Sequence, residues 1–157
     1  MTRLHDAPWR LIAGGSYDEA ALAALRAKLP SGMILERQRR DFSTLLANSL
    51  LSVSQAGYNT VVEGLRLGKP LVLVPFETDA ETEQWIRAER VASLGLAAVV
   101  RERELTPSTL ARAVDLALAR PPGARAGFDF DGVAKSARIV RELADRSAER
   151  GGEAGSP

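Results

Sequence analysis

Three short segments of the sequence carry glycines, hydroxyls and carboxylates that can bind a ligand. Gly14-Gly15-Ser16 ends the first apolar run, Gln55 to Thr60 follows the third, and the acidic segment from Phe76 to Gln84 follows the fourth. A glycine turn that opens a helix presents bare backbone amides and the positive end of the helix dipole, which suits an anion such as phosphate. The sequence contains neither Gly-x-Gly-x-x-Gly nor Gly-x4-Gly-Lys-Ser/Thr, so it supports neither a dinucleotide site nor a P-loop.

Each segment also has a purely structural interpretation. Thr60 and Glu63 have the spacing of a capping box, in which two side chains cap the start of a helix. Gly14-Gly15-Ser16 can be a tight turn between a strand and a helix. Acidic residues are ordinary in the first turn of a helix such as the one predicted from Glu81. The spacing alone does not choose between capped helices and a phosphate site with a carboxylate nearby for sugar hydroxyls.

The apolar pattern places all three segments at one edge of a predicted sheet. Short apolar runs ended by Gly, Pro or polar residues predict strands at 9–13, 33–35, 50–54, 70–74 and 96–100. Helices are predicted between these strands and after the last one, at 17–29, 41–48, 59–67, 81–94, from 106 to before Pro121, and from 132 to about 146. This alternation favours an α/β domain of three layers, with a parallel sheet covered by helices on both faces. Ligands of such sheets bind outside the carboxyl ends of the strands.

Composition and charge exclude several classes of function. The 157 residues are 45% hydrophobic and 26% charged, which is typical of one globular domain. Lys and Arg total 21 against 20 Asp and Glu, and the net charge of +1 disfavours a nucleic-acid binder. The absence of cysteine and the single histidine exclude disulfide scaffolds, thiolate zinc sites and cysteine nucleophiles. No apolar run approaches the ~20 residues of a membrane span and no signal peptide is present, so we expect a cytoplasmic protein.

Three motifs together resemble a known family. They are Ser54-Gln55-Ala56-Gly57-Tyr58-Asn59-Thr60-Val61-Val62-Glu63, the run Gly-Lys-Pro-Leu-Val-Leu-Val-Pro-Phe at 68–76, and Glu83-Gln84 with Ala88. They resemble the C-terminal, nucleotide-sugar-binding domain of glycosyltransferase family 28, which includes the lipid II-forming N-acetylglucosaminyltransferase. The resemblance covers roughly residues 9–119. It implies a Rossmann-like domain with a parallel sheet of about five to six strands, the C-terminal half of a GT-B fold. It also implies metal-independent transfer of a hexosyl group from a nucleotide sugar, a UDP-sugar, with no cofactor.

The resemblance implies donor-binding roles for ten residues. The turn and helix start at Gly57, Tyr58, Asn59 and Thr60 hold the donor's phosphates, and Ser16 faces the same phosphates. Glu63 accepts hydrogen bonds from the ribose hydroxyls, while Glu83 and Gln84 contact hydroxyls of the transferred sugar. Backbone groups of the loop at Arg39 contact the edge of the nucleotide base. Gln55 is the last of the ten donor-binding residues. A carboxylate is an acceptor suited to paired hydroxyls, and helix-end amides suit a diphosphate.

The resemblance also implies that part of the enzyme lies outside this sequence. In the family the acceptor site and the catalytic base belong to an N-terminal half, so the catalytic residues here are unknown. We expect residues 1–8, with His5, to form an N-terminal arm, 9–148 the donor-binding domain, and 149–157 a disordered tail. The chain is then a fragment of a longer enzyme or a subunit that needs a partner, inactive alone, whose missing half could contact a membrane peripherally.

Two alternatives to a transferase domain stay open at this point. A nucleotide-sugar epimerase or hydrolase of the same fold would need an acid or base from Asp18, Glu63 or Glu83. A non-catalytic interaction module, with loops that are only caps, predicts no nucleotide binding. The segment Asp129-Phe130-Asp131 imitates the Asp-x-Asp metal motif of the other glycosyltransferase fold, but its place before the last predicted helix favours a turn and cap.

Overall fold

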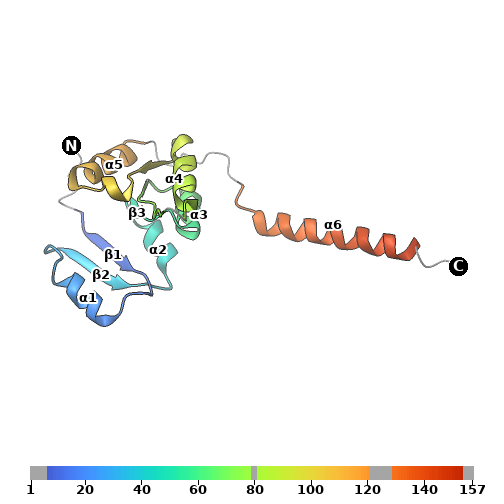
Figure 1. The fold of residues 1–157 in the computed structure, drawn as a ribbon, viewed down its shortest axis with the longest axis horizontal. Helices are drawn as coiled ribbons and strands as arrows, with labels where there is room; N and C mark the ends of the chain where they lie inside the picture. Colours follow the sequence, from blue (N-terminus) through green and yellow to red (C-terminus); the bar gives the residue numbers. More distant parts are fainter. Residues whose placement is uncertain (1–6, 79–80, 121–128, 154–157) are drawn as a thin grey trace. The chain divides into compact units, whose positions relative to one another are not determined.

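A computed structural model of the chain describes residues 7–78, 81–120 and 129–153 (Figure 1). The chain divides into two compact units, Met1–Arg125 and Ala126–Pro157, which are described separately below. Within the described residues, the first unit contains the five strands and the second contains one long helix. The predicted N-terminal arm with His5 and the end of the predicted tail fall largely outside the described residues, and the domain limits 9–148 stay a prediction.

Strands and helices alternate through the first unit, as the sequence predicts. In chain order the elements are β1 (Trp9–Ala13), α1 (Glu19–Arg26), β2 (Met33–Arg37), α2 (Phe42–Ala47), β3 (Ser52–Ser54), α3 (Tyr58–Arg66), β4 (Leu71–Leu73), α4 (Glu83–Ser93), β5 (Ala97–Val99), the 3₁₀ turn η2 (Glu102–Glu104) and α5 (Pro107–Leu118). The limits of β1 match the prediction, β2 is longer than predicted, and β3 to β5 are shorter. The predicted α/β class is confirmed.

All strand pairs are parallel, but the strands form two sheets where one was predicted. In the first sheet β1 pairs with β2 from Trp9–Met33 to Ala13–Arg37. In the second, the order is β3-β4-β5. Each sheet has its own buried cluster, around Leu22 and Leu35 in the first and around Val72 in the second. Apolar runs show which segments are extended but not which edges pair, so this division is invisible in the hydrophobic pattern.

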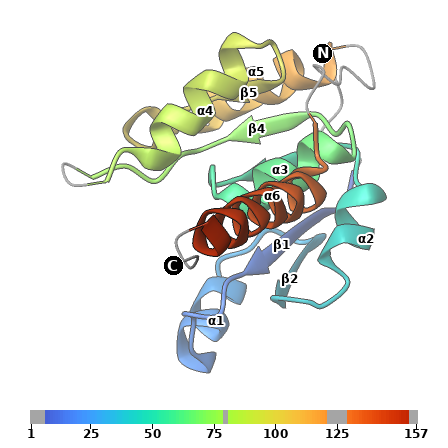
Figure 2. The same cartoon turned by 90° about the vertical axis from the view of Figure 1, so that its right-hand side faces the viewer.

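Strand β4 shows how the helices cover both faces of the second sheet. Successive side chains of a strand point to opposite faces. Val72 is buried against Ala113 and Val114 of α5. On the other face, a Cβ placed on Gly64 of α3 would lie 2.6 Å from Leu71 Cδ2, so this helix lies directly on the strand (Figure 2). The predicted three-layer arrangement is therefore present around β4.

Helix ends follow local sequence signals in four places. Asp18 Oδ1 accepts a 2.7 Å hydrogen bond from the Ala21 amide and caps α1. Thr106 caps α5 in a reciprocal capping box with Thr109. Gly68 (φ +63°) and Gly95 (φ +73°) follow the ends of α3 and α4 in a left-handed conformation that side chains disfavour. These local signals fix where α1 and α5 begin and where α3 and α4 end.

The described residues of the second unit form α6 (Gly132–Glu153) and the turn before it. Asp129 Oδ1 accepts a 2.8 Å hydrogen bond from the Asp131 amide, and the Lys135 ammonium contacts the same carboxylate. The hydrogen bond from Lys135 holds the pKa of Asp129 below its ordinary value. The turn predicted for this motif is present, and Asp131 lies just before the helix, where its backbone carbonyl accepts a hydrogen bond from the Lys135 amide at 3.2 Å. The helix continues through Glu153, whereas the sequence predicts a disordered tail from residue 149. None of the described helices has the length and apolarity needed to cross a membrane.

Candidate functional site

The carboxyl ends of β3 and β4 lie side by side, and each leads into a helix. Ser54 pairs with Leu73, and the Val74 amide donates to the Ser54 carbonyl at 2.8 Å. From β3 the chain passes through an exposed Gln55 into α3, and from β4 it passes through 74–82 into α4. The structure therefore brings together two of the three segments that the sequence singles out.

Helix α3 begins at Tyr58 without a side-chain cap. Gly57 occupies the N-cap position, with φ −62° and ψ 141°, and the Val61 amide donates to its carbonyl at 3.1 Å. Thr60 is therefore the third residue of the helix, and the capping box between Thr60 and Glu63 is wrong. The first amides of a helix have no partner within it. Because no side chain caps them here, these amides are open to an anionic ligand.

The side chain of Glu63 lies one turn into α3. It is 23% exposed, and its Oε2 lies 4.0 Å from Arg66 Nε on the same helix. Because Gly57 and not Thr60 is the N-cap, this half-buried carboxylate does not take part in a capping box. The Glu63 carboxylate can accept hydrogen bonds from a neutral, hydroxyl-bearing part of a ligand.

Arg87 of α4 joins the two segments of the site. Its Nη1 donates a 2.7 Å hydrogen bond to the Ala56 carbonyl, and its Nη2 forms an ion pair with Glu83 Oε1. The guanidinium lies 5.7 Å from the centre of the Tyr58 ring. Arg87 is not among the residues predicted from the sequence, because its main partner is a backbone carbonyl 31 positions away in the chain. The spacing of Glu83 and Arg87, four residues apart on a helix, was the available signal.

The predicted pair Glu83 and Gln84 has two different surroundings. Gln84 Oε1 accepts a 3.2 Å hydrogen bond from the Phe76 amide, so this side chain holds the loop that follows β4. Glu83 is the first residue of α4, and its side chain is 73% exposed. The Gln84 amide nitrogen and the Glu83 carboxylate are thus the groups that this pair can offer to a ligand.

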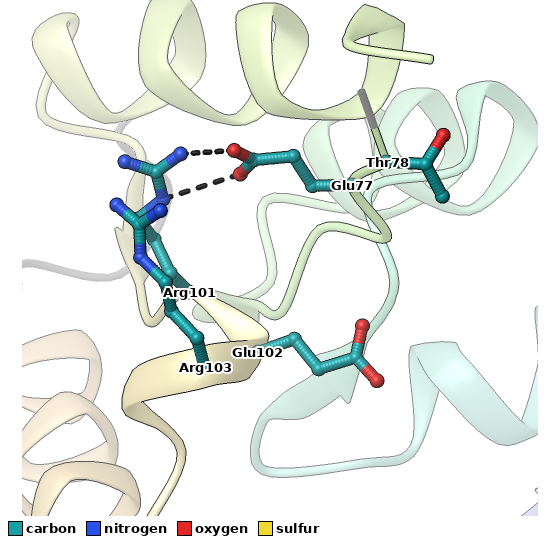
Figure 3. A pocket seen from close by; sticks show the side chains of 5 residues that line it. All are labelled: Glu77, Thr78, Arg101, Glu102 and Arg103. Atoms are coloured by element: carbon teal, nitrogen blue, oxygen red, sulfur yellow. Dashed lines mark hydrogen bonds and ion pairs between the residues drawn. The ribbon is translucent and has the colours of Figure 1, made fainter. Parts of the chain in front are cut away.

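A pocket of about 380 Å³ opens beyond the ends of β4 and β5. It is lined by Glu77, Thr78, Arg101, Glu102 and Arg103. Figure 3 shows the Arg101 guanidinium facing the Glu77 carboxylate in a two-bond ion pair, in which Nε lies 3.1 Å from Oε2. Arg101 also stacks over the Trp85 ring at 4.2 Å. These contacts tie the loop after β4 both to the end of β5 and to α4.

Ser16 and Arg39 belong to the first sheet. Ser16 is exposed in the loop after β1. Arg39 follows β2 and forms two 2.8 Å hydrogen bonds with Asp41, which hold the pKa of that carboxyl below its ordinary value. Asp41 is the N-cap residue of α2, but its carboxylate is paired with Arg39 and makes no side-chain cap hydrogen bond to the helix. Among the described residues, no hydrogen bond or ion pair joins Ser16 or Arg39 to α3 or α4.

The arrangement suits a ligand that has both anionic and hydroxyl groups. The uncapped amides and the helix dipole at the start of α3 can bind an anion. The carboxylates of Glu63 and Glu83 can accept hydrogen bonds from hydroxyl groups. In the described ranges, no three His, Asp or Glu side chains lie together in a way that could hold a metal ion.

Comparison with known families agrees with this chemistry. Residues 33–126 match the family described as the glycosyltransferase family 28 C-terminal domain. The chain belongs to this family. The family predicted from the three motifs is confirmed.

Relatives of the chain in family 28 are longer enzymes. The UDP-N-acetylglucosamine–N-acetylmuramyl-(pentapeptide) pyrophosphoryl-undecaprenol N-acetylglucosamine transferase of Thermotoga neapolitana is 39% identical over 75 residues, which cover 48% of this chain and 22% of that enzyme. The enzyme of the same name from Brucella anthropi is 30% identical over 134 residues, which cover 83% of this chain and 36% of that enzyme. The aligned segments thus span only 22% and 36% of the length of these family 28 relatives.

Solved structures show the same fold. The crystal structure of Acinetobacter baumannii MurG has a TM-score of 0.63 and 20% identity, covering 87% of this chain and 42% of that one. CalG4, the calicheamicin glycosyltransferase, has a TM-score of 0.57 and 32% identity, covering 73% of this chain and 28% of that one. The predicted fold, half of a GT-B glycosyltransferase, is confirmed by these neighbours.

Proposed function

We propose that this family 28 domain binds the nucleotide-sugar donor of a metal-independent glycosyltransferase that transfers a hexosyl group. The donor is a UDP-sugar. The observation that carries the proposal is the uncapped start of α3, with Glu63 on the same helix and Glu83 linked through Arg87 to the Ala56 carbonyl just before it. This combination supports a ligand in which a diphosphate links two groups that bear hydroxyls.

The start of α3 is the proposed diphosphate site. The backbone at Gly57, Tyr58, Asn59 and Thr60 donates hydrogen bonds to the phosphate oxygens, and the helix dipole favours their negative charge. During transfer the diphosphate is the leaving group and gains charge. Fixed amides that already point at this charge stabilise the transition state without a metal ion.

The two carboxylates are proposed to bind the two sugar rings of the donor, one on each side of its diphosphate. Glu63 accepts hydrogen bonds from the ribose hydroxyls, whereas Glu83 and the Gln84 amide contact the transferred sugar. Ser16, Arg39 and Gln55 complete the proposed site, with Ser16 at the phosphates and the Arg39 loop at the base. Because the Arg39 guanidinium is bonded to Asp41 and Glu36, we propose that the Arg39 backbone, and not its side chain, contacts the edge of the nucleotide base.

A second body of protein is proposed to complete the enzyme. The aligned segments cover only 22% and 36% of the length of the two relatives. We assign the acceptor site and the catalytic base to that further part, whether it lies in the same polypeptide or in a partner subunit, and any peripheral membrane contact to it as well. The chain alone is expected to bind donor without transferring it. The cytoplasmic location stays a prediction.

Isothermal titration of the chain with UDP tests the proposal. The wild type should bind, and Glu63→Ala should weaken binding by ~1–3 kcal/mol because charged hydrogen bonds to the ribose are lost. Glu89→Ala, which removes an exposed carboxylate from α4, is the matched control and should bind like the wild type. Unchanged affinity in Glu63→Ala would refute the ribose role. Failure of the wild type to bind UDP would refute the function and favour an interaction module, while turnover of a UDP-sugar without acceptor would favour an epimerase or hydrolase.

A further inference from the structure

Arg87 makes contacts that an ordinary helix-surface arginine does not make. Its side chain is only 18% exposed, although it lies near the start of α4, where Glu83 is 73% exposed. Its partners come from both segments of the site, since one is the Ala56 carbonyl before α3 and the other is the Glu83 carboxylate on α4. A planar guanidinium with donors on two nitrogens can hold both partners in one fixed geometry, which a lysine ammonium cannot do.

The hydrogen bond to Ala56 fixes the direction of the next amide. A trans peptide is planar, and its C=O and N–H point to opposite sides. The described chain has no cis peptide bonds. By holding the Ala56 carbonyl at 2.7 Å, Arg87 therefore sets the orientation of the Gly57 N–H at the N-cap of α3. This N–H is one of the amides assigned above to the diphosphate.

The ion pair to Glu83 orients the carboxylate assigned to the sugar. Arg87 contacts Oε1 of Glu83, while most of that side chain stays exposed. An exposed glutamate normally samples several rotamers, and holding one of its oxygens restricts this freedom. The second oxygen is then presented in a defined direction, so that a hydroxyl can bind to it with less loss of conformational entropy.

We infer that Arg87 is a positioning residue that couples the diphosphate amides of α3 to the sugar-binding carboxylate Glu83. It does so by holding the Ala56 carbonyl and Glu83 Oε1 with one guanidinium. The inference rests on the proposed function and adds the means by which the two subsites keep a fixed spacing. Its consequence is that the sugar contributes to affinity only while Arg87 is present.

The measured quantity is the ratio of the dissociation constant for UDP to that for a UDP-sugar. UDP-N-acetylglucosamine and UDP-glucose are the probes, and the tighter one is used throughout. We expect the wild type to bind the sugar nucleotide about tenfold more tightly than UDP, as one charged hydrogen bond would provide. In Arg87→Met and Arg87→Lys the ratio should fall to about one, since the lysine cannot hold both partners. Adding Glu83→Gln to either variant should then change the ratio no further.

Two controls separate this role from a general loss of structure. Arg90→Met removes an exposed arginine from the same helix and should leave the ratio at its wild-type value. A merely structural Arg87 would weaken both nucleotides equally and leave the ratio unchanged, and that result would overturn the inference. If Arg87→Met fails to fold, Arg87→Lys carries the test, and urea unfolding verifies that it is native.

The outcomes also distinguish the inference from the proposed function. Failure of the wild type to bind UDP refutes both. Tight binding of both nucleotides with a ratio that Arg87 variants do not alter refutes only the coupling. A wild-type ratio of one, unaffected by Glu83→Gln, refutes the assignment of Glu83 to the sugar and the coupling with it, while the diphosphate site stands.

Discussion

The contact between Gly64 and Leu71 gives a stability prediction that the structure determines closely. Gly64 is buried in α3, and a Cβ at this position would lie 2.6 Å from Leu71 Cδ2 and 3.2 Å from Leu71 Cδ1. Leu71 is itself 1% exposed in the middle layer, so its methyl groups cannot swing into solvent. Gly64→Ala must therefore push α3 away from β4 or distort the Leu71 rotamer.

Two opposing terms set the size of the effect. Alanine is better than glycine inside a helix by ~1 kcal/mol. Overpacking a closed core costs ~1–3 kcal/mol, and a 2.6 Å approach to a side chain with no free space belongs at the upper end of that range. We expect Gly64→Ala to destabilise the protein by about 1–2 kcal/mol, taking the difference of these two terms.

A double-mutant cycle with Leu71→Ala isolates the contact. Leu71→Ala alone should cost ~2–5 kcal/mol, because it leaves a cavity between α3 and β4. In that background Gly64→Ala no longer meets the leucine methyls and should become neutral or stabilising. The coupling between the two sites is then ~1–3 kcal/mol, measured by urea unfolding of the four proteins with a common m-value. Additive effects, or a Gly64→Ala protein that is more stable than the wild type, would show that α3 does not lie this close to β4.

Two further predictions concern the helix caps and the first sheet. Thr106→Ala should destabilise the protein by ~0.5–2 kcal/mol in urea unfolding, because Thr106 accepts from the Thr109 amide, whereas Thr82→Ala at the uncapped start of α4 should change it little. The pKa of Asp41, measured by NMR titration, should lie below the ordinary value because of the hydrogen bonds from Arg39, and Arg39→Gln should raise it. A depressed carboxyl pKa means that this ion pair stabilises the fold above the ordinary pKa of Asp and loses its contribution as the pH falls through the lowered pKa of Asp41. An Asp41 pKa that Arg39→Gln leaves unchanged would contradict this pairing.

The sequence allowed the element order to be predicted well, because strong local signals mark it. Trp9–Ala13 is an apolar run that ends at two glycines, and its limits as β1 agree with the structure. Thr106 followed by Pro107 marks the start of α5 equally well. Each of these elements is determined by residues next to one another in the chain, which is the information that periodicity and capping rules use.

The start of α3 was harder to predict, because one set of residues fits two starting points. Thr60 and Glu63 satisfy the capping-box spacing only if Thr60 is the N-cap residue. The hydrogen bond from the Val61 amide to the Gly57 carbonyl starts the helix earlier, with Gly57 as the N-cap. The spacing Thr-x-x-Glu is required for a capping box, but the spacing alone does not show at which residue the helix starts. The error mattered, because the capping interpretation assigned a structural role to both residues.

Contacts across the site were not predictable from spacing. Arg87 reaches a carbonyl 31 positions away, and Arg101 reaches Glu77 across 24 positions. On α4 alone, an arginine four residues after a glutamate looks like a solvated surface pair. Only the packing of α4 against β5 and the parallel pairing of β3 with β4 bring these side chains to their partners.

The stacking of Arg101 over Trp85 has a consequence for how the protein can be observed. The chain has two tryptophans, and the other, Trp9, lies in β1 of the first sheet. Trp85 directly follows Glu83 and Gln84, and a cation lies 4.2 Å from its ring. Indole emission responds to nearby charge, so any movement of α4 or of Arg101 changes the light that Trp85 emits. With Trp9 replaced by phenylalanine, the domain would contain a single optical reporter within one helical turn of the proposed sugar contacts, and occupancy of the site could be followed without a label.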